Sequence, residues 1–527
     1  MAELAPGADI DHRGTPFDED LLARLLTARH DPTTGKPRLG TAKFGGAQFS
    51  GRANFDGAQF STFAEFNGAQ FSTFAWFPGA QFSGPAQFER AQFSDRAEFA
   101  GAQFSGAASF GCARFFGSAG FLQAQFSRDA EFDGVQFADD ATFRRARFAA
   151  APLLGPLVCA GVVDMSGAVF EAPVTLEIAA RGVRCERTRW ESTATVRLRH
   201  ATADLGHAVL SAPVAVIAHP APFTSHEGTL EETLLSSEHG RVRVASVQGV
   251  DAAHLVLSDT DLTDCLFSGA FHLDQLRLEG RITFASTPTG WHRRGMRLTR
   301  WTRRRTLAEE HHWRAQRADQ PEPPSGQPLS LRQWRPGSHH PGPLTPAPEN
   351  IAVLYRQLRK AFEDGKNEPG AADFYYGECE MRRHDHTGTP KNEGRLLWAY
   401  WLLSGYGLRA SRAFTWLLAT MSLTVLLLIG FGLPIHDPDP ATTGTLNGSK
   451  ISLNTSTPDP ALDGGWSKRM TWARAENAVR VAVNSVVFRS SGQNLTTPGA
   501  YIEMTSRLLE PTLLALAALA IRGRIKR

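Results

Sequence analysis

The chain has 527 residues, enough for several domains, and 56 Lys and Arg stand against 53 Asp and Glu. The resulting net charge of +3 excludes a strongly basic nucleic-acid binder and an acidic tail as descriptions of the whole chain. Its five cysteines are scattered and include no C-x-x-C pair, which argues against a zinc site and a disulfide framework and is typical of a reducing compartment.

Residues 1–40 are expected to form an N-terminal capping segment with one short helix. The helix is predicted within 18–29, where acidic residues open the stretch and Leu21, Leu22, Leu25 and Leu26 share a face. The repeat that follows would leave an open end with unpaired backbone groups, which this helix would cover. Docking of the helix elsewhere is the alternative. Residues 2–20 are polar and acidic, unlike a signal peptide.

Residues 41–152 carry a strict repeat in which phenylalanine recurs at alternating steps of five and six residues. A helix would need steps of three and four and a strand steps of two, so the pattern predicts a solenoid with the rings pointing inward. Alanine precedes each Phe by two positions, with Val135 the one replacement. The predicted core consists of Phe44, Phe49, Phe55, Phe60, Phe66, Phe71, Phe77, Phe82, Phe88, Phe93, Phe99, Phe104, Phe110, Phe115, Phe121, Phe126, Phe132, Phe137, Phe143 and Phe148.

Segments such as AQFSG, at 47–51 and 102–106, resemble the pentapeptide-repeat family, whose unit is a small residue, a polar residue, Leu or Phe, and two turn-tolerant residues. The resemblance implies a mainly β fold, a right-handed quadrilateral β-helix with four units per coil. The extra residue in every second unit predicts that each coil spans two eleven-residue repeats and has two lengthened corners. Because one coil cannot bury its own Phe residues, stability must come from stacking of neighbouring coils.

A second regularity concerns the outer surface, where glutamine precedes every second Phe. Stacked coils would place these amides above one another in a hydrogen-bonded ladder that a partner could bind, although Gln as a solvated filler is the alternative. The candidate interaction ladder is Gln48, Gln59, Gln70, Gln81, Gln92, Gln103, Gln125 and Gln136, interrupted by Arg114 and Arg147.

Residues 153–290 lose the strict period but keep short Val- and Leu-rich runs between Gly, Pro and Asp, which predict strands. Five-residue spacing returns at Leu257, Leu262 and Phe267. The segment is therefore predicted to continue the solenoid irregularly, with a separate small β domain as the alternative.

Residues 291–317 are predicted to be a basic helical segment and hold nine Arg and three Trp. Thr306 and Glu309 have the spacing of a capping box, which predicts a helix from about Leu307. An anionic lipid surface is the favoured ligand, and a solvated helix or nucleic acid are the alternatives. The candidate lipid-surface residues are Arg293, Arg294, Arg297, Arg300, Trp301, Arg303, Arg304 and Arg305.

Residues 318–348 hold nine prolines and are expected to be a disordered linker. A helical hairpin is predicted over 349–390, because two helical patterns flank DGKNEPG at 364–370. It is similar to one tetratricopeptide-type hairpin, which is too little for a peptide-binding array.

Residues 391–527 are predicted to be a membrane module. The stretch 413–434 has about twenty uncharged residues, enough to cross a bilayer, and a weaker second span is predicted at about 501–521. An interfacial helix is expected at about 396–408, and an external loop at about 435–500. Basic residues before the first span and after the second predict that the solenoid and the C-terminus both face the cytoplasm.

This module resembles the two-helix pore module of potassium-type channels in architecture alone. The family's Thr-x-Gly-Tyr-Gly filter is missing, and VVFRSSGQNLTT stands at 486–497 instead. The whole chain is similar to pentapeptide-repeat membrane proteins of actinobacteria, a likeness that implies architecture and no established activity.

The residues indicate a membrane-anchored scaffold or interaction protein and not an enzyme. Walker, G-x-S-x-G and G-x-G-x-x-G motifs are missing, so no catalytic residue, cofactor or metal site is predicted. DNA mimicry is disfavoured because the repeat carries ten acidic and nine basic residues. The expected partners are the bilayer and a protein or a second copy of the chain, with nucleic acid and small-molecule substrates disfavoured. A degenerate channel-like or transport-related oligomer with a regulatory solenoid is the alternative.

Overall fold

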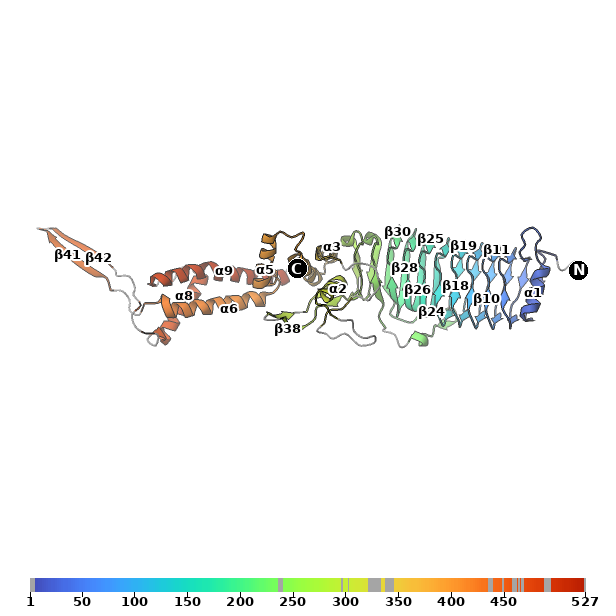
Figure 1. Cartoon of the computed structure of the whole chain (residues 1–527), viewed down its shortest axis with the longest axis horizontal. Coiled ribbons are helices and arrows are strands. Elements are labelled where there is room, and N and C mark those ends of the chain that lie inside the picture. The colour runs from blue at the N-terminus through green and yellow to red at the C-terminus, as the bar shows by residue number, and fades with distance from the viewer. Residues whose placement is uncertain are drawn as a thin grey trace. The chain divides into compact units, whose positions relative to one another are not determined.

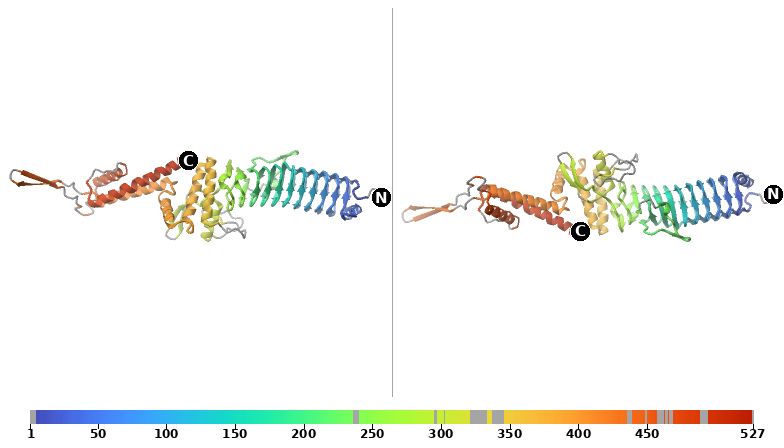
Figure 2. Two further views of the ribbon diagram at one scale, coloured as in Figure 1. Left: turned by 90° about the horizontal axis from the view of Figure 1, so that it is seen from above. Right: turned by 90° about the horizontal axis from the view of Figure 1, so that it is seen from below.

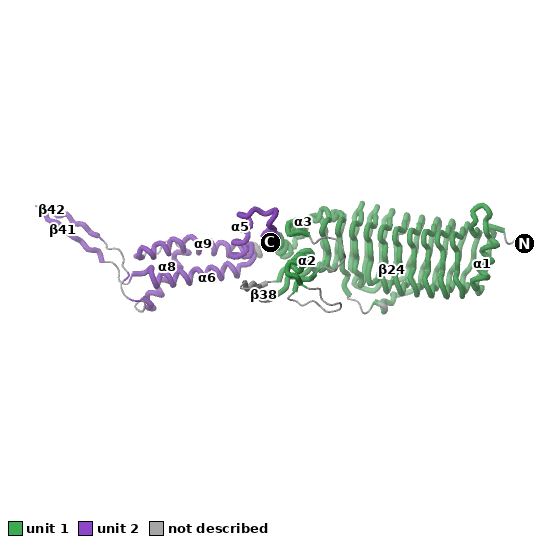
Figure 3. The backbone as a smooth tube through the Cα atoms, viewed as in Figure 1, with its two compact units in different colours: residues 1–378 green, residues 379–527 purple. Residues whose placement is uncertain are grey.

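The structure is a computed structural model that describes residues 5–235, 240–294, 297–301, 303–320, 333–336, 346–434, 439–447, 450–456, 462, 465, 469–487 and 494–525. The chain forms two compact units, Met1–Glu378 and Cys379–Arg527 (Figure 3). The first unit holds a β-solenoid and the helices that close one of its ends, and the second is mainly helical (Figures 1 and 2). The predicted order of a β-solenoid followed by helices is confirmed.

The regular solenoid has four faces of short parallel strands. The first face consists of β1 (Ile10–Asp11), β4 (Ala42–Lys43), β8 (Ala64–Glu65), β12 (Ala86–Gln87), β16 (Ala108–Ser109) and β20 (Ala130–Glu131). The second consists of β2 (Pro16–Phe17), β5 (Gln48–Phe49), β9 (Gln70–Phe71), β13 (Gln92–Phe93), β17 (Arg114–Phe115) and β21 (Val135–Phe137). The third consists of β6 (Ala53–Asn54), β10 (Ala75–Trp76), β14 (Ala97–Glu98), β18 (Ala119–Gly120) and β22 (Ala141–Thr142). The fourth consists of β3 (Arg38–Leu39), β7 (Gln59–Phe60), β11 (Gln81–Phe82), β15 (Gln103–Phe104), β19 (Gln125–Phe126), β23 (Arg147–Phe148), β25 (Val169–Phe170), β27 (Arg189–Trp190) and β30 (Val209–Leu210).

Each ring in the interior stacks on the ring one coil away. Ala75 pairs with Ala97, so each coil spans two eleven-residue repeats, as predicted. The Phe60 and Phe82 rings lie 4.7 Å apart and 2° from parallel, and all twenty predicted core Phe side chains are at most 1% exposed. The alanines before them are also buried, and so is Val135 in the same position, so these small side chains fill the space beside the rings.

The alternating five- and six-residue steps correspond to two kinds of corner. In every five-residue step the third residue of a tight turn has positive φ, as at Gly57 (φ 61°), and the Ala58 N–H donates to the Phe55 carbonyl oxygen at 3.0 Å. The same left-handed position recurs every eleven residues from Gly46 to Arg145, and it is not always glycine. The six-residue corners use no positive φ, so the extra residue replaces the left-handed turn with a wider bend.

The solenoid begins earlier than predicted, because β1, β2 and β3 already belong to its first coil. The helix α1 (Glu19–Ala28) begins after Asp18, whose side chain accepts the Leu21 N–H at 2.8 Å. It occupies the place of a strand beside β6, with Leu22 and Leu26 buried. Only part of 1–40 is therefore a cap, and the described part of the remainder is solenoid.

After β23 the strands lengthen and the coil shortens. Phe148 pairs with Phe170 at the spacing of the regular coils, whereas Phe170 pairs with Trp190, which makes that coil two residues shorter. The second and third faces merge where long strands run around the corner between them. These strands are β24 (Leu153–Asp164), β26 (Val174–Arg184), β28 (Ala194–Arg199), β29 (Thr202–Asp204), β31 (Val214–Ala218), β34 (Arg243–Ser246), β35 (Leu255–Ser258) and β36 (Arg277–Glu279).

The strands of this irregular part pair directly with the regular coils, so both form one solenoid instead of two domains. Two short 3-10 helices, η3 (Ala252–His254) and η4 (Leu273–Gln275), lie in its last coils. An insertion leaves the coil after β31 and carries β32 (Thr224–Ser225), β33 (Gly228–Thr229) and η2 (Thr233–Leu235).

Helices and two antiparallel strand pairs follow the last coil. β37 (Ala285–Ser286) pairs with β40 (Arg305–Thr306), and β38 (Gly290–Arg294) pairs with β39 (Arg297–Trp301). The predicted helix is therefore wrong for the first half of 291–317, where Trp, Leu and Thr, residues that suit strands, stand among the arginines. The helices are α2 (Ala308–Arg317), α3 (Pro348–Asp364) and α4 (Glu368–His384).

Most of the predicted disordered linker at 318–348 lies outside the described residues. Of its described part, residues 333–336 are docked: Trp334 is 8% exposed and packs against His311 and Arg314.

The described part of the second unit consists of helices and one strand pair. They are α5 (Lys391–Ser404), α6 (Ala410–Leu427) with its π-helical continuation η5 (Leu428–Gly432), β41 (Ala441–Asn447), β42 (Lys450–Ser456), α8 (Trp472–Val487) and α9 (Thr497–Ile525). Among the described residues, Ala410–Gly432 and Thr497–Arg522 are long and apolar enough to cross a membrane. The second candidate span starts earlier than predicted and continues as a helix through Pro511.

Candidate interaction surfaces and helical module

Two rows of glutamine run along opposite faces of the regular solenoid, because each coil contains two eleven-residue units. Gln92 pairs with Gln70 on the second face, and Gln81 pairs with Gln103 on the fourth. The second-face row is Gln48, Gln70, Gln92, Arg114 and Gln136, and the fourth-face row is Gln59, Gln81, Gln103, Gln125 and Arg147.

The glutamine side chains are exposed or half-exposed. Within the described part of the chain, no hydrogen bond joins the side-chain amide of one glutamine in a row to the next. The prediction of a hydrogen-bonded ladder is therefore wrong in this respect, although the register is as expected. Each row instead presents evenly spaced amide donors and acceptors to solvent.

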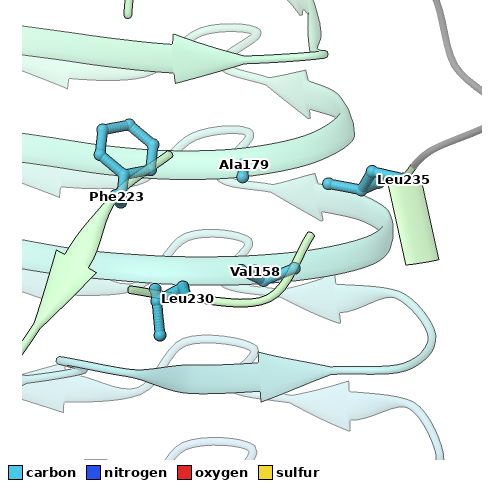
Figure 4. Packing of buried hydrophobic residues seen from close by; sticks show 5 residues of the cluster. All are labelled: Val158, Ala179, Phe223, Leu230 and Leu235. Atoms are coloured by element: carbon cyan, nitrogen blue, oxygen red, sulfur yellow. The ribbon is translucent and has the colours of Figure 1, made fainter. Parts of the chain in front are cut away.

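The insertion after β31 folds back over the outside of the solenoid. Phe223, Leu230 and Leu235 cover Val158 of β24 and Ala179 of β26 in a small apolar cluster (Figure 4). This part of the surface is therefore covered by the chain itself and is not a docking face.

A groove of about 700 Å³ crosses the third face where the coil shortens. Small residues such as Gly182 and charged residues of both signs line this groove. The charged residues are Arg144, Arg145, Asp164, Arg184, Glu186, Arg187 and Asp204. Burial raises the pKa of Asp204 above its ordinary value. The mixture of four arginines with three acids does not select one class of ligand.

The comparison with known protein families decides the nature of this solenoid. A family model of pentapeptide repeats, in nine copies, matches residues 44–92 and 66–111. The regular solenoid belongs to the pentapeptide-repeat family. No curated protein and no solved structure matches the chain. The likeness to actinobacterial membrane proteins therefore stays a prediction.

The C-terminal side of the pentapeptide-repeat solenoid is closed by a buried polar network on α2. Glu310 is fully buried, and its carboxylate accepts from Arg304 at 2.5 Å, from Arg314 at 2.7 Å and from the Tyr355 hydroxyl at 2.5 Å. Burial alone would raise the pKa of Glu310. The positive charges of Arg304 and, to a smaller extent, of Arg314 outweigh this effect and lower the pKa to about 2. Glu310 is therefore ionised, and the network holds α2 against α3.

His311 belongs to the same closing layer. Its Nδ1 accepts the Arg335 N–H at 3.2 Å, so the ring proton lies on Nε2, which is 2.8 Å from the Thr306 hydroxyl oxygen. Burial lowers the pKa of His311 to about 3, so the ring is neutral. Thr306 therefore does not form the predicted capping box, and α2 begins after Leu307 without a side-chain cap.

The candidate lipid-surface residues fall in two places. Arg293, Arg294, Arg297, Arg300 and Trp301 lie on the β38–β39 hairpin, and Arg303 is exposed next to it. Arg305 is half-buried in β40, and Arg304 does not belong to this surface, because it is 3% exposed and paired with Glu310. The role of Arg304 is structural, and sequence reasoning missed it because only the fold brings it together with Glu310 and with Tyr355, which lies 51 residues later.

In the second unit, a buried carboxylate joins three helices. Glu510 of α9 is fully buried, and it accepts from Thr424 of α6 at 2.8 Å and from Ser485 of α8 at 3.3 Å. Ser506 extends the group by donating to the Ser485 hydroxyl oxygen at 3.0 Å. Hydrogen bonding of this kind is what allows a carboxylate to stay within an apolar helix.

The opposite end of α8 is tied to the end of the first candidate span. The Arg474 guanidinium donates to the carbonyl oxygens of Ile429 at 2.9 Å and Leu433 at 2.7 Å. Ile429 lies in the last turn of η5 and Leu433 directly follows it, and carbonyl groups at a helix end need partners from outside the helix. The chain returns to the same place at Thr496, whose hydroxyl donates to the carbonyl oxygen of Phe431 at 2.6 Å.

Sequence reasoning missed these groups because each joins residues that are distant in the chain. It also missed a cluster of Cys112, His226 and Glu227 beside Asp133, which forms where the insertion reaches back to the regular coils. Within a single sequence, Cys112 was visible as a cysteine at a position that elsewhere is often glycine. Nothing in the sequence placed it beside a histidine 114 residues later.

Proposed function

We propose that the chain is a membrane-anchored pentapeptide-repeat scaffold that binds a protein partner through the outer faces of its solenoid. The observation that supports this most is the pair of in-register rows of exposed glutamine and arginine. A regular row of amide groups suits a partner with a matching repeat of backbone or side-chain polar groups. A protein partner or a second copy of the chain is the expected ligand.

The anchor in this proposal is the pair α6 and α9. Only 28% of the most apolar 18-residue stretch of each candidate span is buried, and large apolar side chains such as Leu418 (64% exposed) and Leu508 (69% exposed) face outward. Apolar surface of this extent is unfavourable in water and favourable in a bilayer. We infer that both spans cross the membrane, with the solenoid and the C-terminus in the cytoplasm and the β38–β39 arginines near the lipid headgroups.

Membrane attachment is tested by washing membranes that contain the full chain with alkaline carbonate. The chain is expected in the membrane pellet, and release into the supernatant would contradict the anchor. Protease added to intact cells and to inside-out vesicles tests the sidedness. The solenoid should be cut only in the inside-out vesicles.

The partner-binding faces are tested with the full chain in detergent as bait. One variant carries Gln48→Lys, Gln70→Lys and Gln92→Lys, and a matched variant carries Gln59→Lys, Gln81→Lys and Gln103→Lys. Partners that the wild-type chain captures should be lost from one variant and kept by the other, because the two rows lie on opposite faces. Equal capture of partners by the wild-type chain and both variants would show that neither glutamine row binds the partner.

The arrangement of α8 favours a second candidate, a degenerate channel-like module. α8 starts beside the end of η5, at Arg474, and its far end, at Ser485, lies beside Thr424. Thr424 stands eight residues before Gly432, or about 12 Å along the helix. α8 therefore packs against both α6 and α9 and ends beside their middle, and the chain returns to the starting level at Thr496. A re-entrant helix of this kind is typical of pore modules.

Channel activity is tested by reconstituting the full chain in planar bilayers and counting subunits by crosslinking in detergent. The channel candidate predicts tetramers and single-channel currents. A monomeric protein that conducts no current would rule out the channel candidate, and the anchored scaffold would be the remaining proposal. The filter stretch at 486–497 lies partly outside the described residues.

A further inference from the structure

The tip of the β32–β33 hairpin brings two metal-binding side chains next to a cysteine of the regular coils. His226 and Glu227 lie beside Cys112, and one ligand atom from each of the three residues lies within 4.8 Å of the others. The Cys112 sulfur and the His226 Nε2 atom are 3.8 Å apart. Two such ligands at about 2.3 and 2.1 Å from one tetrahedral zinc ion would be roughly 3.6 Å apart.

The orientation of the histidine suits metal binding. The Asp133 carboxylate forms a hydrogen bond with His226 Nδ1, and it also accepts the His226 backbone N–H at 3.2 Å. This bond places the proton on Nδ1 and directs the Nε2 lone pair toward Cys112. A carboxylate bound to the outer nitrogen is the usual arrangement behind a metal-ligating histidine.

The surroundings favour a cation. A cavity of about 510 Å³ adjoins the cluster, and its wall carries the carboxylates Glu89, Asp129, Glu131 and Asp133 with Arg90 as the basic residue. Arg90 forms an ion pair with Glu227 at 2.5 Å, so a metal ion would compete with a guanidinium for that carboxylate.

The backbone leaves room for the approach of the hairpin. Gly134 has φ 74°, and a Cβ atom on it would lie 2.9 Å from the Cys112 sulfur and 3.4 Å from the Ser225 Cβ atom. Any side chain at this position would therefore push the hairpin and the cysteine apart.

We propose that Cys112, His226 and Glu227 form a binding site for one divalent transition-metal ion of the zinc type, with Asp133 orienting the histidine. A thiolate and an imidazole together select zinc and similar ions over magnesium or calcium. The fourth position would hold water, and binding would displace the thiol proton to solvent.

The same three side chain types occur in cysteine nucleophile sites, but the surroundings disfavour that use. Burial, followed by the nearby Glu227 carboxylate, raises the pKa of the Cys112 thiol to about 12. A thiol in this state is a weak nucleophile, because reactivity requires the thiolate. A positive metal ion reverses this preference and stabilises the thiolate directly.

The test is a titration of the full chain in detergent with cobalt(II), followed by the near-ultraviolet band that a thiolate–cobalt bond produces. The wild-type chain should show the band at one cobalt per chain, and zinc should abolish it by displacement. Cys112→Ser should remove the band, and Asp133→Asn should weaken cobalt binding about 10- to 100-fold. Arg90→Gln, which frees Glu227 without removing a ligand, should bind cobalt at least as tightly as wild type.

A second readout is the rate of thiol alkylation, which does not depend on the cobalt absorption band. Cys112 is half-buried while the other four cysteines are buried, so it is the thiol most accessible to iodoacetamide in the folded chain, and alkaline pH supplies enough thiolate for a slow alkylation. Zinc should slow that alkylation in the wild-type chain and in Arg90→Gln, and should not slow it in His226→Gln. If the wild-type chain shows no band and zinc gives no protection, the three residues only fasten the hairpin to the solenoid, and the proposal is wrong.

Discussion

The Glu309 carboxylate accepts the backbone N–H of Phe267 at 2.5 Å, and this bond joins α2 to the last coils of the solenoid. The same oxygen accepts the Ser268 N–H at 3.0 Å. A solenoid end exposes such donors, and a buried donor without a partner is costly. Glu309 therefore caps exposed backbone donors at the C-terminal end of the solenoid, and α1 covers the N-terminal end.

Replacing this side chain should loosen the C-terminal cap. Glu309→Ala leaves the buried Phe267 N–H and the partly buried Ser268 N–H without this acceptor and should lower the free energy of unfolding of the solenoid by about 1–3 kcal/mol. Glu309→Gln keeps a carbonyl acceptor, so its free energy of unfolding should fall clearly less than that of Glu309→Ala. Urea unfolding followed by circular dichroism measures both, and equal losses in the two variants would contradict the assigned hydrogen bonds.

The same residue should make stability depend on pH. Burial raises the pKa of Glu309 from 4.5 to about 7, although its backbone N–H partners oppose the shift. A carboxyl group with a raised folded-state pKa binds protons more tightly in the folded chain, so its contribution is full below pH 4.5 and is lost as pH rises to 7. The difference in unfolding free energy between wild type and Glu309→Gln should therefore fall by roughly 3 kcal/mol over this window. A difference that stays constant from pH 4.5 to 7 would show that the carboxyl does not titrate there.

The stacked rings make a sharp prediction about the core. Phe93 is buried and stacks on Phe115 at 4.5 Å, so Phe93→Ala should cost about 3–5 kcal/mol of unfolding free energy. Phe116, one residue beyond that stack, is 55% exposed, and Phe116→Ala should change stability by less than about 0.5 kcal/mol. Thermal melts of the two variants compare them directly. Similar melting temperatures would mean that the interior column is not the main source of stability.

The left-handed corners can be tested without disturbing any side-chain contact. Gly68 has φ 65°, and a Cβ atom added there would meet nothing within 4 Å, so Gly68→Ala adds backbone strain alone and should cost about 1–2 kcal/mol. Gln123 occupies the equivalent position with φ 56°, and Gln123→Gly should relieve that strain and raise stability by up to about 1 kcal/mol. Opposite signs for the two substitutions are the expected result, and a loss in both would contradict the corner geometry.

The regular solenoid could be predicted from the sequence because its information is local and repeated. The five- and six-residue steps of Phe specify inward rings at every unit, and a break at one unit would have been visible. The eleven-residue period, together with the four units per coil that the family resemblance implies, also indicated two eleven-residue repeats per coil, which the pairing of Ala75 with Ala97 shows. Two repeats per coil also place the glutamines on two opposite faces, a consequence that the prediction of a single ladder did not include.

The features that failed to emerge from the sequence depend on single contacts that no repeat or periodic pattern encodes. Arg304 looked like one more exposed arginine in a basic run, yet Glu310 and Tyr355 bury it. The meeting of Cys112 with His226 depends on an insertion whose path no periodicity encodes. In the irregular coils, the shortening of the coil after Phe170 removed the period on which the prediction relied.

The packing of α6 against α9 depends on two glycines that meet backbone to backbone. A Cβ atom on Gly499 would lie 2.7 Å from the Gly432 Cα atom, and backbone atoms cannot move away as a flexible side chain can. Close contact of this kind between small residues is a common way for apolar helices to associate in a bilayer. Gly499→Ala should therefore separate the helix ends and weaken the bond from Thr496 to the Phe431 carbonyl oxygen.

Gly394→Ala is the matched control, because a Cβ atom there would meet nothing within 4 Å and Gly394 lies inside the helix α5. In the control, alanine in a helix interior should stabilise by roughly 0.5–1 kcal/mol. Heating the purified full chain in detergent and measuring the fraction that stays soluble should give a lower midpoint for Gly499→Ala than for wild type, and an equal or higher one for Gly394→Ala. If Gly499→Ala matched the wild-type midpoint, the two helices would not be in contact at Gly432, and the described route of the chain from η5 to α9 would have to be abandoned.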